Sequence, residues 1–479
     1  MSQLKTIGKN SAALFVAQIL SYVLAFFYTL YMARYLGADG YGSISLAVSL
    51  TGIFGILVDM GLNTLLIREV ARDKSKTNKF ISNTAIMKVI LSLVTLGAIY
   101  IFVNLSGYSE LVKTLIYVVY LSVVIGSYSN IFNAVIQAEE KMEYVSVSTI
   151  ISGLVMFFGT LIGIYYSWDV VYFAALYVIS NGLNFIYISI IYFWKFNVPQ
   201  IDVDFGFWKP VLKEAWPFGL TSLSGQLYTY VDTVIISLMQ GTLVVGWYSA
   251  AYRLIITLLF VPTAVNIAIF PVMSRLYTSS KESLLLVNER YFKYMLILGV
   301  PLGFGTVVLA DKIILLIFGT EYIPSIIALQ ILIWTTVFTF IGASFVQLLQ
   351  SINKQLILTK ISFICLVINV ILNLFLIPKY SYIGASAVTL VTEIILVSYT
   401  IFICFKLGYG FDINKNVKIL LKVLFASLIM SAFLLYFAYL NLFLLVFIGI
   451  ILYFVIIYLV KIIDDVDKQM FRELIGRSE

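Results

Sequence analysis

Five ionisable side chains lie well inside long apolar stretches of this chain: Asp59, Lys88, Asp232, Arg253 and Glu393. Each stretch has the length of a membrane span, and a charge at the centre of such a span costs roughly 2.5–3.5 kcal/mol. We therefore expect these side chains to face protein or water and not lipid. Arg253 is suited to binding an anionic phosphate group, because its planar guanidinium can donate to two oxygens and stays charged at any cellular pH.

Asp232 and Arg253 are placed as a pair in the sequence. Each lies about ten residues from the predicted outer turn around Thr242 and Leu243, which at 1.5 Å per helical residue gives both a depth of ~15 Å. Two interpretations follow from this matched depth. Either the two side chains form a buried ion pair that ties adjacent helices together, or Arg253 belongs to a net basic cavity that receives an anionic headgroup.

Asp59 and Lys88 are matched in depth on two other spans, and Lys88 is a second candidate ligand for an anionic headgroup. Arg34 and Arg68 lie near the ends of the first two spans, where they are candidate rim residues of the same path or topological anchors. Glu393 has no partner that the sequence identifies, and burial of a carboxyl favours its neutral form. The candidates for an ion pair or for a coupling cation are Asp59, Asp232 and Glu393.

Several kinds of chemistry lack the residues that they need. The chain has no histidine, which is the commonest general base and metal ligand, and no Gly-Lys-Ser/Thr loop for ATP. The outer connections are short and their acids are scattered. We therefore expect no catalytic residue, no metal, no cofactor and no enzyme activity, with a membrane glycosyltransferase or ligase as the less favoured alternative. Basic residues interleaved with aromatics on a soluble face are absent too, which argues against nucleic acid as a partner.

The elements that must position these side chains are membrane-spanning helices. The mean hydropathy is +1.02 and only 11% of the residues are charged, and a bilayer core of ~30 Å needs roughly 20 residues of helix. The sequence predicts an all-α integral membrane fold with about fourteen spans. Their predicted ranges are 10–33, 42–64, 81–104, 114–136, 146–167, 170–194, 215–238, 247–271, 291–311, 325–350, 355–377, 383–405, 418–439 and 441–460. Cys365 and Cys404 fall within spans and are expected to be buried thiols.

The basic residues predict how the spans are oriented. Of the 31 lysines and arginines, 25 fall on the side of the N-terminus and four on the opposite side, when the connections are taken alternately. Cytoplasmic connections carry the excess of positive charge. We therefore expect a multi-pass protein of the cytoplasmic membrane with both termini in the cytoplasm.

Three prolines interrupt predicted spans: Pro217, Pro262 and Pro301. Proline in a helix interior removes one backbone hydrogen bond and kinks the axis. These residues are therefore the candidates for kinks and for gating positions.

An internal repeat divides the chain. Three residues recur with the same offset of 213, namely Phe132, Gln137 and Lys141 with Phe345, Gln350 and Lys354, and Gly40-Tyr41 resembles Gly246-Trp247. The offset covers six spans, an even number, so the two copies share one orientation in the membrane. We predict two pseudosymmetric six-helix lobes, 1–200 and 201–412, followed by two appended spans and a tail in 413–479. Such lobes enclose a cavity that can open alternately to the two sides by rocking.

Six short motifs, in order along the chain, resemble one known group of membrane transporters. They are Gly37-Ala38-Asp39-Gly40-Tyr41-Gly42, Arg68-Glu69-Val70-Ala71-Arg72, Gln137 with Glu140-Lys141-Met142-Glu143-Tyr144, Trp216-Pro217-Phe218 with Tyr230-Val231-Asp232, Gly246-Trp247-Tyr248-Ser249-Ala250-Ala251-Tyr252-Arg253, and Phe318-Gly319-Thr320-Glu321-Tyr322. The chain resembles, over essentially its full length, the polysaccharide-transporter (Wzx-type flippase) branch of the multidrug/oligosaccharidyl-lipid/polysaccharide exporter superfamily.

The resemblance implies a flippase that moves an undecaprenyl- or dolichyl-linked oligosaccharide to the outer leaflet by alternating access. Its expected partners are the lipid-linked oligosaccharide, membrane lipids and a coupling H⁺ or Na⁺, with glycan-assembly proteins as further candidates. The headgroup would be bound by Arg253, Lys88, Arg34 and Arg68. An ion-coupled exporter of drugs or other lipids, from the same superfamily, is the alternative.

Overall fold

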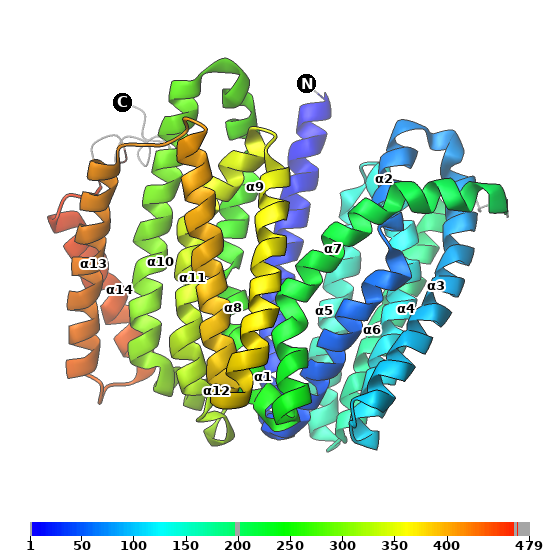
Figure 1. Cartoon of the computed structure of the whole chain (residues 1–479), viewed down its shortest axis with the longest axis horizontal. Coiled ribbons are helices and arrows are strands. Elements are labelled where there is room, and N and C mark those ends of the chain that lie inside the picture. Colours follow the sequence, from blue (N-terminus) through cyan, green and yellow to red (C-terminus); the bar gives the residue numbers. More distant parts are fainter. Residues whose placement is uncertain (1, 197–201, 464–466, 468–479) are drawn as a thin grey trace. The chain divides into compact units, whose positions relative to one another are not determined.

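The computed structural model describes residues 2–196, 202–463 and 467, and every regular element within these ranges is a helix (Figure 1). The α-helices are α1 (Ser2–Asp59), α2 (Leu62–Arg72), α3 (Thr77–Leu105), α4 (Glu110–Ala138), α5 (Met142–Tyr165), α6 (Val170–Lys195), α7 (Phe205–Gln240), α8 (Thr242–Leu258), α9 (Phe260–Ser279), α10 (Lys281–Ile317), α11 (Ser325–Ser351), α12 (Gln355–Lys406), α13 (Ile413–Tyr436) and α14 (Leu442–Leu459). Short 3₁₀ turns lie at Lys74–Lys76 and Thr320–Tyr322. The predicted all-α class is confirmed.

Eleven helical segments of the described chain are long and apolar enough to cross a membrane. Two of them, α1 and α12, each correspond to two predicted spans, because a single non-helical residue divides them: Gly37 with φ of 70° and Ser381 with φ of 53°. The predicted span 215–238 is helical within α7 but is not among the eleven. Glycine, serine, threonine and the buried Asp232 lower its hydropathy, as expected for a helix that does not face lipid all round.

The three prolines act differently on their helices. The predicted span 247–271 is divided at Leu259, between α8 and α9, three residues before Pro262. Proline has no N–H to donate to the carbonyl four residues earlier, so the helix ends there. In contrast, α7 continues through Pro217 and α10 continues through Pro301.

The chain divides into two compact units, and the first contains residues 1–253 and 370–385. In this unit α1 packs against α4 and α5, and α6 packs against the same two helices. Two glycines allow α1 and α8 to approach closely. A Cβ on Gly246 would lie 1.8 Å from the Ala38 carbonyl oxygen, and one on Gly42 would lie 1.9 Å from the Thr242 carbonyl oxygen. The motif glycines of the sequence thus lie at a backbone-to-backbone contact.

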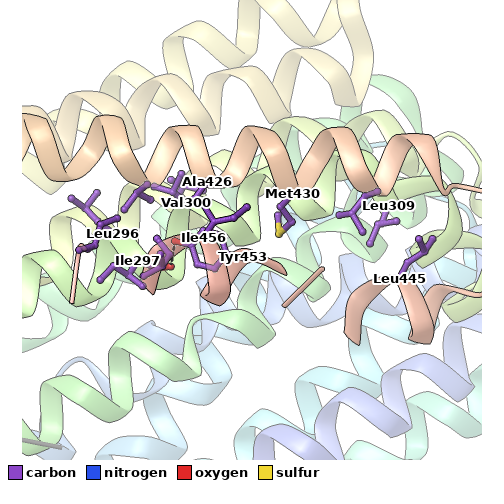
Figure 2. Packing of buried hydrophobic residues seen from close by; sticks show 14 residues of the cluster. Leu296, Ile297, Val300, Leu309, Ala426, Met430, Leu445, Tyr453 and Ile456 are labelled. Atoms are coloured by element: carbon purple, nitrogen blue, oxygen red, sulfur yellow. Dashed lines mark hydrogen bonds between the residues drawn. The ribbon is translucent and has the colours of Figure 1, made fainter. Parts of the chain in front are cut away.

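The second unit contains residues 254–369 and 386–479. Here α10 packs against α11 and α13, and α13 packs against α14. Figure 2 shows the apolar cluster that joins α10, α13 and α14, including Val300, Met430 and Leu445. Within it the Tyr453 hydroxyl donates to the Ile297 carbonyl oxygen at 2.8 Å, so the one polar tip of the cluster is satisfied. Cys365 and Cys404 are buried free thiols, as predicted.

Candidate functional site

Lys88 and Asp59 form an ion pair inside the first unit, which is one of the two interpretations that their matched depth left open. The Lys88 Nζ atom lies 2.9 Å from Asp59 Oδ1, and it also donates to Asn63 Oδ1 at 2.9 Å and to the Ser127 carbonyl oxygen at 2.8 Å. Lys88 is fully buried. The Lys88 ammonium group thus has one carboxylate at ion-pair distance and two hydrogen-bond acceptors, all from the protein. This geometry favours a structural role for Lys88 over contact with a headgroup.

Asp232 is buried between two side chains that the sequence did not identify as its partners. Its carboxylate accepts from the Tyr248 hydroxyl at 3.0 Å and from the Asn373 amide at 2.6 Å. Tyr248 belongs to α8 and Asn373 to α12, and both lie in the first unit. The two donors come from different helices and hold this buried carboxylate in its position. In the sequence, Asn373 and Asn369 are two asparagines four residues apart in an otherwise apolar stretch, which is the signal that could have indicated Asn373.

Arg253 lies near three tyrosines of the first unit. Its charge interacts with the side chains of Tyr41, Tyr177 and Tyr230, which come from α1, α6 and α7. The Arg253 side chain is partly exposed, whereas Tyr41 is buried. A guanidinium among aromatic side chains is suited to a phosphate group next to a sugar, since tyrosine rings can stack on sugars and their hydroxyls can donate.

The two candidate rim residues have different surroundings. Arg34 is exposed near the middle of α1. Arg68 is bound by two carboxylates, with Nε 3.0 Å from Glu69 and a terminal nitrogen in a short contact with Glu214, and its guanidinium lies 5.7 Å from the Phe218 ring. The hydrogen bond with Glu214 raises the pKa of Arg68. Arg68 therefore joins α2 to α7, which favours the anchoring interpretation for it.

Glu393 has a partner in the second unit that the sequence analysis did not find. The Thr339 hydroxyl of α11 donates to Glu393 Oε1 at 2.7 Å. The two residues are 54 positions apart in the chain, and neither spacing nor periodicity connects them. The carboxyl is thus held within the packing of α11 against α12.

A polar pocket in the first unit was also missed, because its residues are uncharged. The cavity has a volume of about 280 Å³ and is lined by Gly126, Ser129, Asn130, Asn133, Gln137, Val145, Ser148, Thr149, Ser152, Asn181 and Asn184. We call it the amide pocket. The Asn184 amide donates to Ser152 Oγ at 2.8 Å and to the Ser148 carbonyl oxygen at 3.2 Å. Among the described residues, the buried Oδ1 atoms of Asn133 and Asn184 have no hydrogen-bond donor, so the pocket offers acceptors to a hydroxyl-bearing guest or to water.

Comparison with known proteins identifies the family of the chain. A profile of the family described as "Polysaccharide biosynthesis protein" matches residues 7–277, more than half of the chain, and a MatE profile matches residues 217–375. The chain is 25% identical over 415 residues to the capsular polysaccharide biosynthesis protein CapF of Staphylococcus aureus, covering 82% of this chain and 98% of the relative. It is 25% identical over 398 residues to the probable low-salt glycan biosynthesis flippase Agl15 of Haloferax volcanii, covering 80% of each protein.

The fold is also found among solved structures. The lipid II flippase MurJ in its inward closed conformation superposes with a TM-score of 0.76, at 19% identity, over 97% of this chain and 99% of that one. At this identity the likeness shows the fold alone. The family profile, the relatives and the many apolar helices together show that the chain is a multi-pass membrane protein that belongs to the polysaccharide biosynthesis protein family of the multidrug/oligosaccharidyl-lipid/polysaccharide exporter superfamily.

Proposed function

We propose that this protein is a flippase that moves a polyprenyl-diphosphate-linked oligosaccharide across the cytoplasmic membrane for the assembly of a surface polysaccharide or glycan. The observation that carries the proposal is the partly exposed Arg253 among three tyrosines in the first unit. A permanent cation inside a membrane helix is costly, and an anionic headgroup that passes through the protein explains its presence. Enzyme activity is not part of the proposal.

The names of the relatives support the same substrate class. One is a capsular polysaccharide biosynthesis protein and another is a probable glycan biosynthesis flippase. The amide pocket adds uncharged donors and acceptors of the kind that sugar hydroxyls need. In this proposal the lipid tail stays in the bilayer, whereas the diphosphate and the sugars cross through the protein.

Transport proceeds by alternating access between two six-helix lobes, 1–200 and 201–412, with the spans of 413–479 appended and both termini in the cytoplasm. Moving each negative charge outward through an inside-negative potential is favourable by ~2.3 kcal/mol per 100 mV, so an anionic headgroup needs little further driving force. We propose Asp232 as the carboxylate that takes a coupling H⁺ or Na⁺, because it is buried and accepts from Tyr248 and Asn373, which come from two other helices. Glycan-assembly proteins are proposed as partners.

An ion-coupled drug exporter is the second candidate, and the MatE match over residues 217–375 favours it. Cationic drugs require an acidic cavity, whereas Arg253 contributes a positive charge. The two candidates therefore differ in the sign of the substrate.

The test is a transport assay in vesicles that contain the full chain. We expect Arg253→Gln to lower outward movement of a lipid-linked oligosaccharide at least tenfold, while Arg275→Gln, at an exposed position of α9, leaves it unchanged. Neither variant should export a lipophilic cation. If the vesicles export the lipophilic cation and not the oligosaccharide, the protein is a drug exporter and the flippase proposal is wrong.

A further inference from the structure

A basic pocket lies between three helices of the second unit, α10, α13 and α14, and contains none of the residues discussed so far. It has a volume of about 340 Å³ and is lined by Glu289, Arg290, Lys293, Asp412, Asn414, Lys415, Lys418, Ile419, Lys422, Lys461 and Ile462. These residues come from the first half of α10, the start of α13 and the end of α14. We propose that this pocket binds the phosphate headgroup of an anionic membrane phospholipid.

The charges of the pocket are only partly compensated by the protein. Six of the lining side chains are lysine or arginine, and two are acidic. Lys415 forms an ion pair with Glu289 at 2.8 Å. In the part of the chain that the structure describes, Lys418, Lys422 and Lys461 have no carboxylate within ion-pair distance. Lys422 donates to the Val460 carbonyl oxygen at 2.7 Å, which fixes its position without compensating its charge.

The inner wall of the pocket already holds an anion of the chain itself. Asp467 is fully buried and accepts from Lys293 at 2.5 Å, from the Tyr294 hydroxyl at 2.7 Å and from Arg290 in a short contact. Three donors from α10 around one carboxylate show that this wall is built to bind negative groups. Among the described residues, Lys418, Lys422 and Lys461 then remain without a carboxylate partner, and the proposal assigns them to the lipid phosphate.

The lipid-facing surface beside the pocket favours a phospholipid over a free phosphate ion. Val417, Leu421, Phe425 and Leu428 are between 45% and 59% exposed along α13, and their spacing of three or four residues places them on one face of the helix. Lys418 and Lys422 follow two of them directly in sequence. A headgroup in the pocket would therefore lie next to an apolar strip for its acyl chains.

Lysines that only set the orientation of the spans in the membrane need not cluster around one pocket. The positive-inside bias requires basic residues in cytoplasmic connections but does not require them to meet. Here lysines from the start of α13 and the end of α14, together with Arg290 and Lys293 from α10, line one cavity. Basic pockets between spanning helices are the setting in which anionic headgroups bind.

The experiment measures lipid binding by the detergent-solubilised full chain with native mass spectrometry, titrating phosphatidylglycerol and, separately, phosphatidylcholine. The test variant is Lys418→Gln/Lys422→Gln/Lys461→Gln. The matched control, Lys354→Gln/Lys360→Gln/Lys406→Gln, removes the same charge from exposed sites of the same unit. We expect phosphatidylglycerol to bind the test variant about tenfold or more weakly than wild type, the control to bind within about twofold of wild type, and phosphatidylcholine to bind weakly throughout.

Two further variants keep the result interpretable. Lys418→Gln/Lys461→Gln leaves the Lys422 bond to α14 intact and should show an intermediate loss, while replacing all three lysines by arginine should retain binding. Equal losses in test and control variants, or equal affinity for the two lipids, would overturn the proposal. If inorganic phosphate displaces phosphatidylglycerol at equal concentration, the pocket binds a free anion and not a lipid headgroup. Because no transport is measured, the outcome does not depend on the proposed flippase activity.

Discussion

The turn after α4 and the turn after α11 have the same backbone but different surroundings. Glu140 and Asn353 both have φ of 59°. In each turn the next residue, Lys141 or Lys354, donates its backbone N–H to the carbonyl five residues earlier, at 3.1 and 2.8 Å. α4 and α11 end 213 residues apart, and α5 and α12 begin 213 residues apart. The offset seen in the sequence is therefore also an offset between two equivalent helix ends.

The side chains around the two turns are not equivalent. Near the first turn the amide pocket contains Asn130, Asn133, Ser148 and Ser152. The residues 213 positions later are Ala343, Val346, Ile361 and Cys365. At these four positions the second copy thus forms the same pair of helix ends with apolar side chains. Packing alone does not require the amides of the first copy, which suggests that they serve a polar guest or water.

The largest expected effect concerns the charges that the first unit buries. Lys88→Met would leave the Asp59 carboxylate without its cation, and breaking a buried pair in this way typically costs about 3–5 kcal/mol. Glu393→Gln in the second unit keeps a hydrogen-bond acceptor for Thr339 and should cost less than about 1 kcal/mol. Thermal unfolding in detergent measures both. Similar melting temperatures for the two variants would show that the units do not differ in this respect.

The second prediction tests the close approach of α1 and α8, where the motif glycines of the two copies meet. Gly246→Ala places a Cβ against the Ala38 carbonyl oxygen and should destabilise the protein by about 1–3 kcal/mol. Gly225→Ala is the control, because a Cβ there meets no atom within 4 Å and alanine favours a helix. The free energy of unfolding of the two purified variants tests this expectation. A Gly246→Ala protein as stable as the control would mean that the helices can separate without cost.

The third prediction converts the amide pocket of the first copy to the residues of the second: Asn130→Ala, Asn133→Val, Ser148→Ile and Ser152→Cys together. We expect the protein to remain folded, since the second copy packs in this way, but to transport roughly tenfold more slowly because polar contacts to the substrate are lost. Flipping rate and elution profile are measured on the same preparation. Unchanged transport would assign the pocket to internal water alone.

Much of the fold could be predicted from the sequence, since spans follow from hydropathy. The matched depth of Asp59 and Lys88, on spans adjacent in the chain, indicated an ion pair as one of two interpretations. The partners of Asp232 and Glu393 could not be predicted. Asn373 is 141 residues from Asp232 and Thr339 is 54 residues from Glu393, so these contacts depend on tertiary packing. The amide pocket was missed for another reason. Uncharged polar residues are tolerated in spans at low cost and carry no signal by themselves.

The central claim, that Arg253 binds the headgroup, is tested most directly by exchanging two side chains. In the double variant Asp232→Arg/Arg253→Asp any pair between them is rebuilt, but the cation moves to α7 and a carboxylate takes its place on α8. We predict that this variant, inserted and folded in vesicles, moves no more lipid-linked oligosaccharide than empty vesicles do, because the carboxylate repels the diphosphate. Flipping restored to near the wild-type rate would contradict the account and leave Arg253 as a structural residue.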